Sequence, residues 1–229
     1  MLTVIIPALN EEKYLPKALE SIKTQDIECE IVVADARPTD RIIEIVKDYR
    51  CRIVDGGRPA KGRNEGAKIA AGDLLLFIDA DVVLPPGSLK RNVDEFLKRG
   101  LDIATCSAIP LSHNLVDRLV YSFANYAVFV FQKIRPFAQG FCIFAKKSLH
   151  DKIGGFDETI QFGEDSEYVL RASKFGKFGI LGNKIYVSAR RFEKEGRLRA
   201  VLKYLYLNLY RLIRGEIRKP VNYDFGNYD

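Results

Sequence analysis

Short apolar runs alternate with amphipathic stretches through the first hundred residues. Each run has the length of a buried strand, and the predicted strands are Leu2–Ile6, Ile31–Ala34, Arg52–Val54 and Leu74–Ile78. Between them, apolar residues recur at helical spacing. The predicted helices cover 11–23 (capped by Asn10), 40–49 (capped by Thr39 or Asp40) and 64–71. Strands and helices that alternate at this length predict a parallel, doubly wound α/β sheet.

The second half of the chain is less regular. Helices are expected over 87–99, 115–134, 164–175 and 196–214, and strands over 102–108, 139–145, 178–181 and 184–188. No internal repeat, low-complexity segment or linker interrupts the pattern. We therefore expect one domain with a C-terminal helical extension and a polar, Tyr-rich tail.

Composition limits the class of protein. The chain has 229 residues, of which 47% are hydrophobic, and this is enough for a full core and excludes a disordered chain. Four cysteines lie far apart without a CxxC pair, which argues against a zinc site or a disulfide framework and favours reduced thiols in the cytosol. The N-terminus lacks the pattern of a signal peptide, and no apolar run of about 18 residues predicts a membrane-spanning helix.

The positive charge is a regional property. The net charge is +6, yet residues 190–219 alone hold ten Lys or Arg against three Glu, a local charge of +7. The rest of the chain is therefore close to neutral. A basic C-terminal region permits binding to an anionic surface, whether nucleic acid or membrane.

Candidate chemistry gathers where the predicted strands end. In a doubly wound sheet, ligands bind beyond the carboxyl ends of the parallel strands. The segments that fall there are Pro7–Asn10, Asp35, Gly56-Gly57 and Asp79–Asp81. The sequence therefore predicts a ligand site at this edge.

Asp79 and Asp81 follow a buried strand with one small residue between them. Unpaired buried carboxylates are unfavourable, and a divalent cation that also binds substrate phosphates relieves the repulsion. The alternative is a helix cap or an ordinary turn. If both carboxylates lay apart from a shared pocket, already neutralised by Lys or Arg, this argument for a metal-dependent enzyme would fail.

Two cations, Lys61 and Arg63, precede the helix predicted from Asn64. Cations and free backbone N–H groups at a helix start suit a diphosphate. The alternative for Lys61 is a solvated basic turn, and Asn64 is expected to organise the turn.

Five sequence blocks together resemble the family-2 glycosyltransferases of the GT-A fold. They are VIIPALNEE (4–12), EIVVADARPTD (30–40), GRNEGAKIAAGDLLLFIDADV (62–82), GGFDE (154–158) and GEDSEYVLRASKFG (163–176). The resemblance implies a GT-A, Rossmann-like fold with a mixed, mainly parallel sheet over residues 1–190. Its nucleotide-binding half covers about 1–110 and its acceptor half about 111–190, and a basic amphipathic helix and tail follow over 191–229.

The resemblance also implies roles at the donor side. Pro7, Ala8 and Glu11 would lie by the nucleoside, and Asp35 would accept hydrogen bonds from the base, although turn chemistry also explains an Asp there. Arg37 would reach the nucleotide of a UDP- or GDP-linked donor. The family often has two consecutive acids where this chain has Asp35-Ala36, so the base stays open. Asp79 would lie near ribose and sugar, and Asp81 with Asp79 would ligate Mg²⁺ or Mn²⁺.

Glu164-Asp165 stands at the start of a predicted helix, where acids complement the helix dipole. In the family this is the site of the catalytic base, which implies Asp165 as base and Glu164 as its support. Arg190 or Arg191 would pair with Asp165 or hold the diphosphate.

The leading hypothesis is an inverting, metal-dependent glycosyltransferase with a hydroxyl acceptor on a carbohydrate or a lipid-linked molecule. A polyprenyl-phosphate sugar synthase is the first alternative, because its anionic acceptor needs no general base. A nucleotidyltransferase would need a basic Gly-rich loop after the first strand, which PALNEE is not. A general nucleic-acid binder would not need the acidic crevice. The QxxRW motif of processive family members is absent, which favours single transfer.

Two amphipathic helices leave alternatives open. Residues 115–134 predict either a core helix or a face for a lipid-linked acceptor or membrane. Residues 197–214 carry Leu on one face with a basic rim, which fits an anionic membrane surface, a core helix or a homodimer interface. The expected location is the cytoplasm, with peripheral attachment at the inner face of the membrane as one option.

Overall fold

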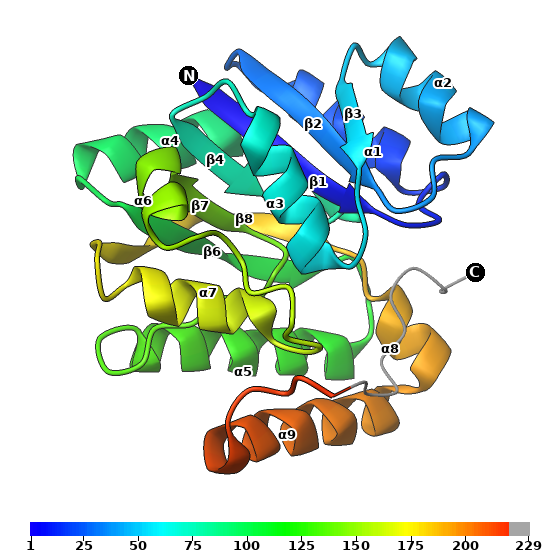
Figure 1. Cartoon of the computed structure of the whole chain (residues 1–229). Helices are drawn as coiled ribbons and strands as arrows, with labels where there is room; N and C mark the ends of the chain where they lie inside the picture. Colours follow the sequence, from blue (N-terminus) through cyan, green and yellow to red (C-terminus); the bar gives the residue numbers. More distant parts are fainter. Residues whose placement is uncertain (220–229) are drawn as a thin grey trace.

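A computed structural model of the chain describes residues 1–219 (Figure 1). Its strands are β1 (Leu2–Ala8), β2 (Cys29–Asp35), β3 (Arg52–Asp55), β4 (Leu74–Phe77), β5 (Val82–Val83), β6 (Ile103–Pro110), β7 (Ile143–Lys146) and β8 (Phe178–Val187). Its helices are α1 (Leu15–Lys23), α2 (Asp40–Asp48), α3 (Pro59–Ile69), α4 (Ser88–Lys98), α5 (Leu115–Phe131), α6 (Lys147–Lys152), α7 (Glu164–Ala172), α8 (Arg190–Glu195) and α9 (Arg197–Arg214).

The strands form one mixed sheet in the order β3-β2-β1-β4-β7-β6-β8-β5. β1 lies between β2 and β4 and is parallel to both, and β2 is parallel to β3. β7 runs antiparallel to β4 and to β6, whereas β6 and β8 are parallel. The predicted mixed, mainly parallel α/β sheet is confirmed.

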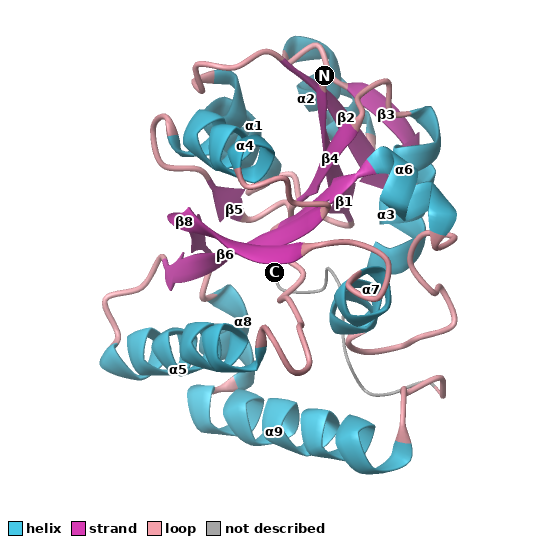
Figure 2. Cartoon of the chain, turned by 90° about the vertical axis from the view of Figure 1, so that its left-hand side faces the viewer, coloured by secondary structure: helices cyan, strands magenta, loops and turns pink. Residues whose placement is uncertain are grey.

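Helices cover both faces of the sheet (Figures 1 and 2). Alternate residues of one strand belong to different cores: Val4 and Ile6 pack with α1, α2 and α4, whereas Ile5 packs with α3 and α7. This two-sided burial explains why the strands read as continuous apolar runs instead of alternating ones.

Several boundaries differ from the prediction. α1 begins at Leu15, because Asn10 has a left-handed backbone (φ 57°) and caps no helix there. α3 begins at Pro59, five residues before Asn64, and a proline in the first helical turn is a favourable start. The two strands predicted over 178–188 are one, β8, and the strand predicted from Gln139 begins at Ile143.

Other expectations agree with the structure. Thr39 caps α2 by accepting a hydrogen bond from the backbone N–H of Ile42 at 3.3 Å. The extension predicted from residue 191 corresponds to α8 and α9, although a division at residue 190 stays a prediction. The polar tail predicted at the C-terminus falls mostly outside the described residues. Within residues 1–219, no helix combines the length and apolar character needed to cross a bilayer.

Candidate active site

The carboxyl ends of three neighbouring strands meet at one edge of the sheet. The register pairs Ala8 at the end of β1 with Asp35 at the end of β2, and Ile5 of β1 with Phe77 of β4. The chain that leaves β4 carries Asp79 and Asp81. The structure therefore brings the predicted donor-side residues together.

Arg190 links two of these carboxylates. Its Nη1 donates to Oε2 of Glu11 at 2.8 Å, its Nη2 donates to Oε1 of the same side chain, and its Nε lies 3.1 Å from Oδ2 of Asp81. The guanidinium also stacks 4.2 Å from the ring centroid of Tyr14. Arg190 begins α8, so the turn after β8 supplies the cation that holds the β1 and β4 ends together.

Burial changes the acidity of both partners of Arg190. Burial raises the pKa of Glu11 to about 7, although Arg190 lowers it, and nearby Asp81 and Asp79 raise it further. Burial likewise raises the pKa of Asp81 to about 6, against the opposing effect of Arg190. Both shifts thus arise mainly from burial, and the neighbouring acids add to them.

Arg63 is a second, fully buried link. Its Nη1 donates to Oε1 of Glu164 at 2.9 Å, and its Nη2 donates to Oδ1 of Asp79 at 3.0 Å and to the Gly140 carbonyl at 3.2 Å. Burial lowers the pKa of Arg63, but the carboxylates Asp79, Glu164 and Asp165 outweigh this effect and raise it. Because α3 begins at Pro59, Arg63 lies inside the helix and contacts acids, instead of preceding a helix start as predicted.

Asp79 and Asp81 each have an arginine partner, which corrects the premise that they are unpaired acids. They nevertheless lie close enough that Asp79 raises the pKa of Asp81. Asp79 keeps 41% of its side-chain surface exposed. Within residues 1–219, no three His, Cys, Asp or Glu side chains are gathered so as to hold a metal by themselves.

Asp165 lies half-buried beside this network. Its Oδ1 accepts from the Ser166 backbone N–H at 2.6 Å. Burial and the neighbouring Glu164 raise the pKa of Asp165 to about 6, whereas Arg63 and Arg211 lower it. Arg63 and Arg211 are thus cations whose charges act on Asp165, and the predicted pairing of Asp165 with Arg190 or Arg191 stays a prediction. A carboxylate with this pKa is largely ionised at neutral pH and can accept a proton.

Gly140, which the sequence pattern did not single out, fills the gap between these groups. A Cβ at Gly140 would lie 2.7 Å from Nη2 of Arg63 and 3.1 Å from Oδ2 of Asp165. A side chain there would push the guanidinium and the carboxylate apart. The only sequence signal was a glycine at the start of an apolar run, which does not distinguish this role.

Asp35 carries an unsatisfied oxygen. Its Oδ1 accepts from the Arg37 backbone N–H at 2.7 Å, but its Oδ2 is buried with no hydrogen-bond partner among residues 1–219. Burial raises the pKa of this carboxyl. A buried acceptor without a donor at a strand end suits a ligand N–H.

The other predicted donor-side residues line the same edge. Ala8 is buried and Pro7 is half-buried, and a Cβ at Gly62 of α3 would come within 3.1 Å of the Pro7 Cβ. The side chains of Arg37 and Lys61 are exposed. Nη1 of Arg191 donates to the Tyr204 hydroxyl at 2.6 Å, so Arg191 joins α8 to α9.

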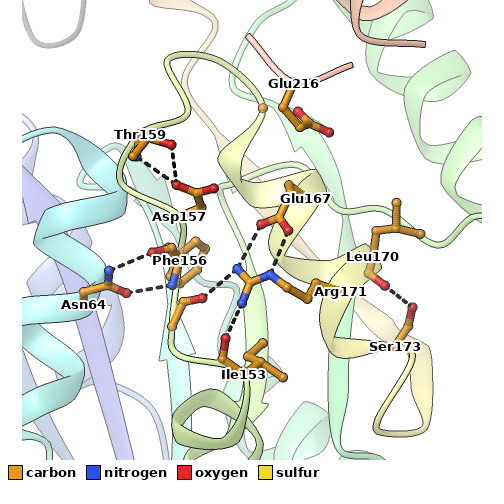
Figure 3. Close-up of polar contacts among 12 residues, drawn as sticks. Asn64, Ile153, Phe156, Asp157, Thr159, Glu167, Leu170, Arg171, Ser173 and Glu216 are labelled. Atoms are coloured by element: carbon orange, nitrogen blue, oxygen red, sulfur yellow. Dashed lines mark hydrogen bonds and ion pairs between the residues drawn. The ribbon is translucent and has the colours of Figure 1, made fainter. Parts of the chain in front are cut away.

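The loop before α7 is held by polar contacts (Figure 3). Nδ2 of Asn64 donates to the Phe156 carbonyl at 2.9 Å, and its Oδ1 accepts from the Phe156 N–H at 2.8 Å, as expected for a residue that organises a turn. Arg171 pairs with Glu167 through its Nε at 2.7 Å and donates to the carbonyls of Ile153 and Gly155. These contacts join α3 and the later part of α7 to the loop at 153–156, and α7 carries Glu164 and Asp165 in its first turn.

The last described segment closes on the same loop. Nη2 of Arg211 in α9 donates to the Gly163 carbonyl at 2.9 Å, and its Nε donates to Glu216 at 2.8 Å. The Gln161 N–H donates to the Ile217 carbonyl at 2.7 Å. Gly163 has a left-handed backbone (φ 80°), and a Cβ there would collide with Arg211. The sequence pattern did not reveal this contact.

Known proteins resemble the chain in sequence. The poly(ribitol-phosphate) β-N-acetylglucosaminyltransferase TarS of Staphylococcus aureus (strain Mu50) is 27% identical in an alignment of length 206 that covers 84% of this chain and 36% of TarS. The minor teichoic acid biosynthesis protein GgaB of Bacillus subtilis is 30% identical in an alignment of length 208 that covers 80% of this chain and 22% of GgaB. The chain thus matches about a third or less of the length of these relatives.

The fold also matches solved structures, and the model of one family covers most of the chain. The crystal structure of S. aureus TarS 1–349 has a TM-score of 0.66 at 22% identity, and covers 87% of this chain and 64% of that one. The mannosyltransferase PcManGT of Pyrobaculum calidifontis has a TM-score of 0.67 at 19% identity, and covers 90% and 64%. These matches confirm the predicted GT-A fold. The model of glycosyl transferase family 2 matches residues 3–154. The chain therefore belongs to glycosyl transferase family 2.

Proposed function

We propose that this protein transfers a sugar from a nucleotide-diphosphate sugar to a hydroxyl acceptor, with inversion at the anomeric carbon. The observation that carries the proposal is the buried Arg63, which joins Asp79 on the donor side to Glu164 beside Asp165. One guanidinium thus holds the donor-side acid and the candidate base in a fixed relation.

In the proposed reaction, the Asp165 carboxylate takes the proton of the acceptor hydroxyl. The hydroxyl oxygen forms a bond to the anomeric carbon on the face opposite the diphosphate. The bond between that carbon and the diphosphate oxygen breaks, and its electron pair leaves on the nucleoside diphosphate. Glu164 and Arg63 keep Asp165 in position, and Asp35 accepts a hydrogen bond from the base of the nucleotide.

The donor set suits Mg²⁺ or Mn²⁺. Such ions commonly bind through one or two carboxylates together with substrate phosphates and water, so a three-residue cluster is not required. Asp81 and Asp79 would hold the ion, whose charge offsets the negative charge of the departing diphosphate. Because burial raises the pKa of Asp81, a bound cation would stabilise the ionised form of this carboxylate.

Known relatives support a nucleotide-sugar donor. TarS 1–349 has been solved in complex with UDP-GlcNAc, and PcManGT in complex with GDP-Man and Mn²⁺. We assign Arg63 to holding the carboxylates, and Lys61, Arg37 and Arg191 to the donor phosphates or nucleotide.

A donor screen followed by an activity assay tests the proposal. Thermal shifts are measured against UDP-, GDP- and dTDP-sugars, with and without Mn²⁺. One nucleotide class is expected to raise the melting temperature in the presence of metal, and Asp81→Ala is expected to remove that shift. Asp26→Asn, an exposed acid away from the site, serves as the control.

Transfer by Asp165→Asn distinguishes the acceptor classes. With a hydroxyl acceptor, the variant is expected to lose about 10²- to 10⁴-fold in rate while it keeps the donor shift. Undiminished transfer to a polyprenyl phosphate would instead identify the anionic-acceptor alternative. Absence of a shift with every nucleotide sugar would refute the proposed donor class.

A further inference from the structure

Helix α9 turns large apolar side chains outward along its whole length. Six aliphatic residues are between 57% and 72% exposed, namely Leu198, Leu202, Leu205, Leu209, Leu212 and Ile213. The opposite face is the packed one, where Ala200 and Leu207 are buried and Tyr204 contacts Phe162 and Phe192. The helix therefore has an inner face toward the protein and an unpartnered apolar outer face.

Helix α5 repeats this arrangement. Its exposed side chains include Leu115, Leu119, Phe123, Tyr126 and Phe129, each between 63% and 71% exposed. Its buried residues are Asp117 and Val128. The wide apolar face of this helix is thus not part of the core, and the core-helix interpretation is corrected.

The two helices are neighbours at one end of the molecule (Figures 1 and 2). Nε of Arg197 at the start of α9 lies 2.9 Å from Oδ1 of the buried Asp117 in α5. We call the exposed residues of the two preceding paragraphs the α5–α9 apolar surface. A soluble monomer seldom exposes apolar residues over so much of two adjacent helices, so a partner is expected there.

The charges beside this surface are almost all positive. Arg118, Lys133 and Arg135 are exposed in or just after α5, and Arg199 and Arg214 are exposed on α9. The acids of these segments are engaged inward: Asp117 with Arg197, and Glu216 with Arg211. Glu193 of the neighbouring α8 is exposed, but these five exposed cations outnumber it, so the surface repels a basic partner and attracts a negatively charged one.

We propose that the α5–α9 apolar surface docks on an anionic lipid bilayer, with the two helices lying in the membrane interface. Helices with an apolar face flanked by Lys and Arg bind at the boundary between the lipid headgroups and the acyl chains, and the cations add affinity for anionic headgroups. The absence of a spanning helix among residues 1–219 agrees with attachment at the surface. A second copy of this basic chain would instead bring like charges together.

This docking places the bilayer beside the candidate base. The inner face of α9 contacts Arg191 through Tyr204 and the Gly163 carbonyl through Arg211. Gly163 immediately precedes Glu164 and Asp165. Lipid on the outer face of α9 would therefore lie one helix away from the acid pair.

Vesicle flotation of the full chain tests the proposal. The protein is mixed with vesicles of phosphatidylcholine, with or without phosphatidylglycerol, at low and high salt. We expect binding to the anionic vesicles that falls as salt rises, and weak binding to phosphatidylcholine alone. Charge reversal by Arg199→Glu with Arg214→Glu should weaken binding at least about tenfold. Phe123→Gln with Leu209→Gln should have a similar effect.

Matched variants elsewhere on the surface control for charge and hydrophobicity. Lys98→Glu with Lys174→Glu makes the same charge change, and Leu97→Gln with Phe175→Gln removes two exposed apolar side chains. Both controls should bind like the unchanged protein. Circular dichroism verifies that every variant is folded. Equal binding by surface and control variants would overturn the proposal. So would a lack of vesicle binding, including the case in which the protein forms a dimer that the surface variants dissociate.

Discussion

The buried guanidinium of Arg63 donates to the Glu164 carboxylate at 2.9 Å, across 101 positions of sequence. This contact joins α3 to the start of α7 and holds the acid pair against the sheet edge. Because the same guanidinium also contacts Asp79, one side chain connects both halves of the candidate active site.

Replacement of Arg63 by Met should destabilise the fold. The change leaves the buried Glu164 carboxylate without its cation, and breaking a buried ion pair in this way commonly costs about 3–5 kcal/mol. Chemical denaturation measures the free energy of unfolding. Lys61→Met, on the exposed face of the same helix, should change it by less than about 0.5 kcal/mol. Equal stability of the two variants would show that Arg63 does not hold the fold together.

The rate of sugar transfer should fall in acid with an apparent pKa near that of Asp165. Burial and Glu164 raise this pKa to about 6, so the base is ionised above pH 6 and loses its proton-accepting form below it. The pH profile of kcat/KM measures the acid limb. Because Arg211 lowers the pKa of Asp165, Arg211→Gln should move this limb to higher pH. Lys174→Gln, an exposed change elsewhere, should leave the limb in place, and an unmoved limb in Arg211→Gln would argue against Asp165 as the titrating group.

Gly140→Ala should strongly lower the rate of sugar transfer while it changes the melting temperature only slightly. The added methyl group would lie 2.7 Å from the guanidinium of Arg63 and 3.1 Å from the Asp165 carboxylate, so it displaces the base from its position. A misplacement of a catalytic group by about 1 Å commonly lowers the rate about 10²-fold. Steady-state kinetics and thermal melting together separate the two effects. Gly182→Ala is the control, since its nearest atom would be the end of the Glu95 side chain at 3.3 Å. Full activity in Gly140→Ala would exclude the close approach as a requirement.

Asp35→Asn should weaken donor binding without weakening the free protein. The buried Oδ2 of Asp35 has no hydrogen-bond partner in the described part of the chain, and burial raises the pKa of the carboxyl, so loss of the charge should not destabilise the unliganded fold. Loss of one charged acceptor should raise the Kd for the nucleotide about tenfold or more, because a hydrogen bond to a charged group contributes about 1.5–3 kcal/mol. Isothermal titration calorimetry with the nucleotide measures this change. Unchanged affinity would remove Asp35 from the base-binding role.

The sequence pattern located the site better than it located the contacts within it. Asp35, Asp79 and Asp81 follow predicted strands that the alternation of strands and helices makes parallel, so their common edge was predictable. The pair between Glu11 and Arg190 joins residues 179 positions apart, and it depends on how the chain turns after β8. No local pattern specifies such a contact.

The sequence contains a signal for the true start of α3, namely Pro59. Pro59 stands in the first turn of the helix, a position that proline favours, whereas the prediction began the helix at Asn64. That shift moves Arg63 from a helix start into the helix, where it reaches Glu164 instead of open solvent. α5 shows the opposite case, because an apolar face that faces solvent has the same periodicity as one that faces a core.

The hydrogen bond from Arg211 to the Gly163 carbonyl attaches α9 to the residue that directly precedes the acid pair. A side chain at position 163 would collide with Arg211, so a substitution of Gly163 requires a compensating change in α9. A chimera that takes α9 from a relative would therefore keep this contact only if it carries both an arginine at position 211 and a glycine at position 163.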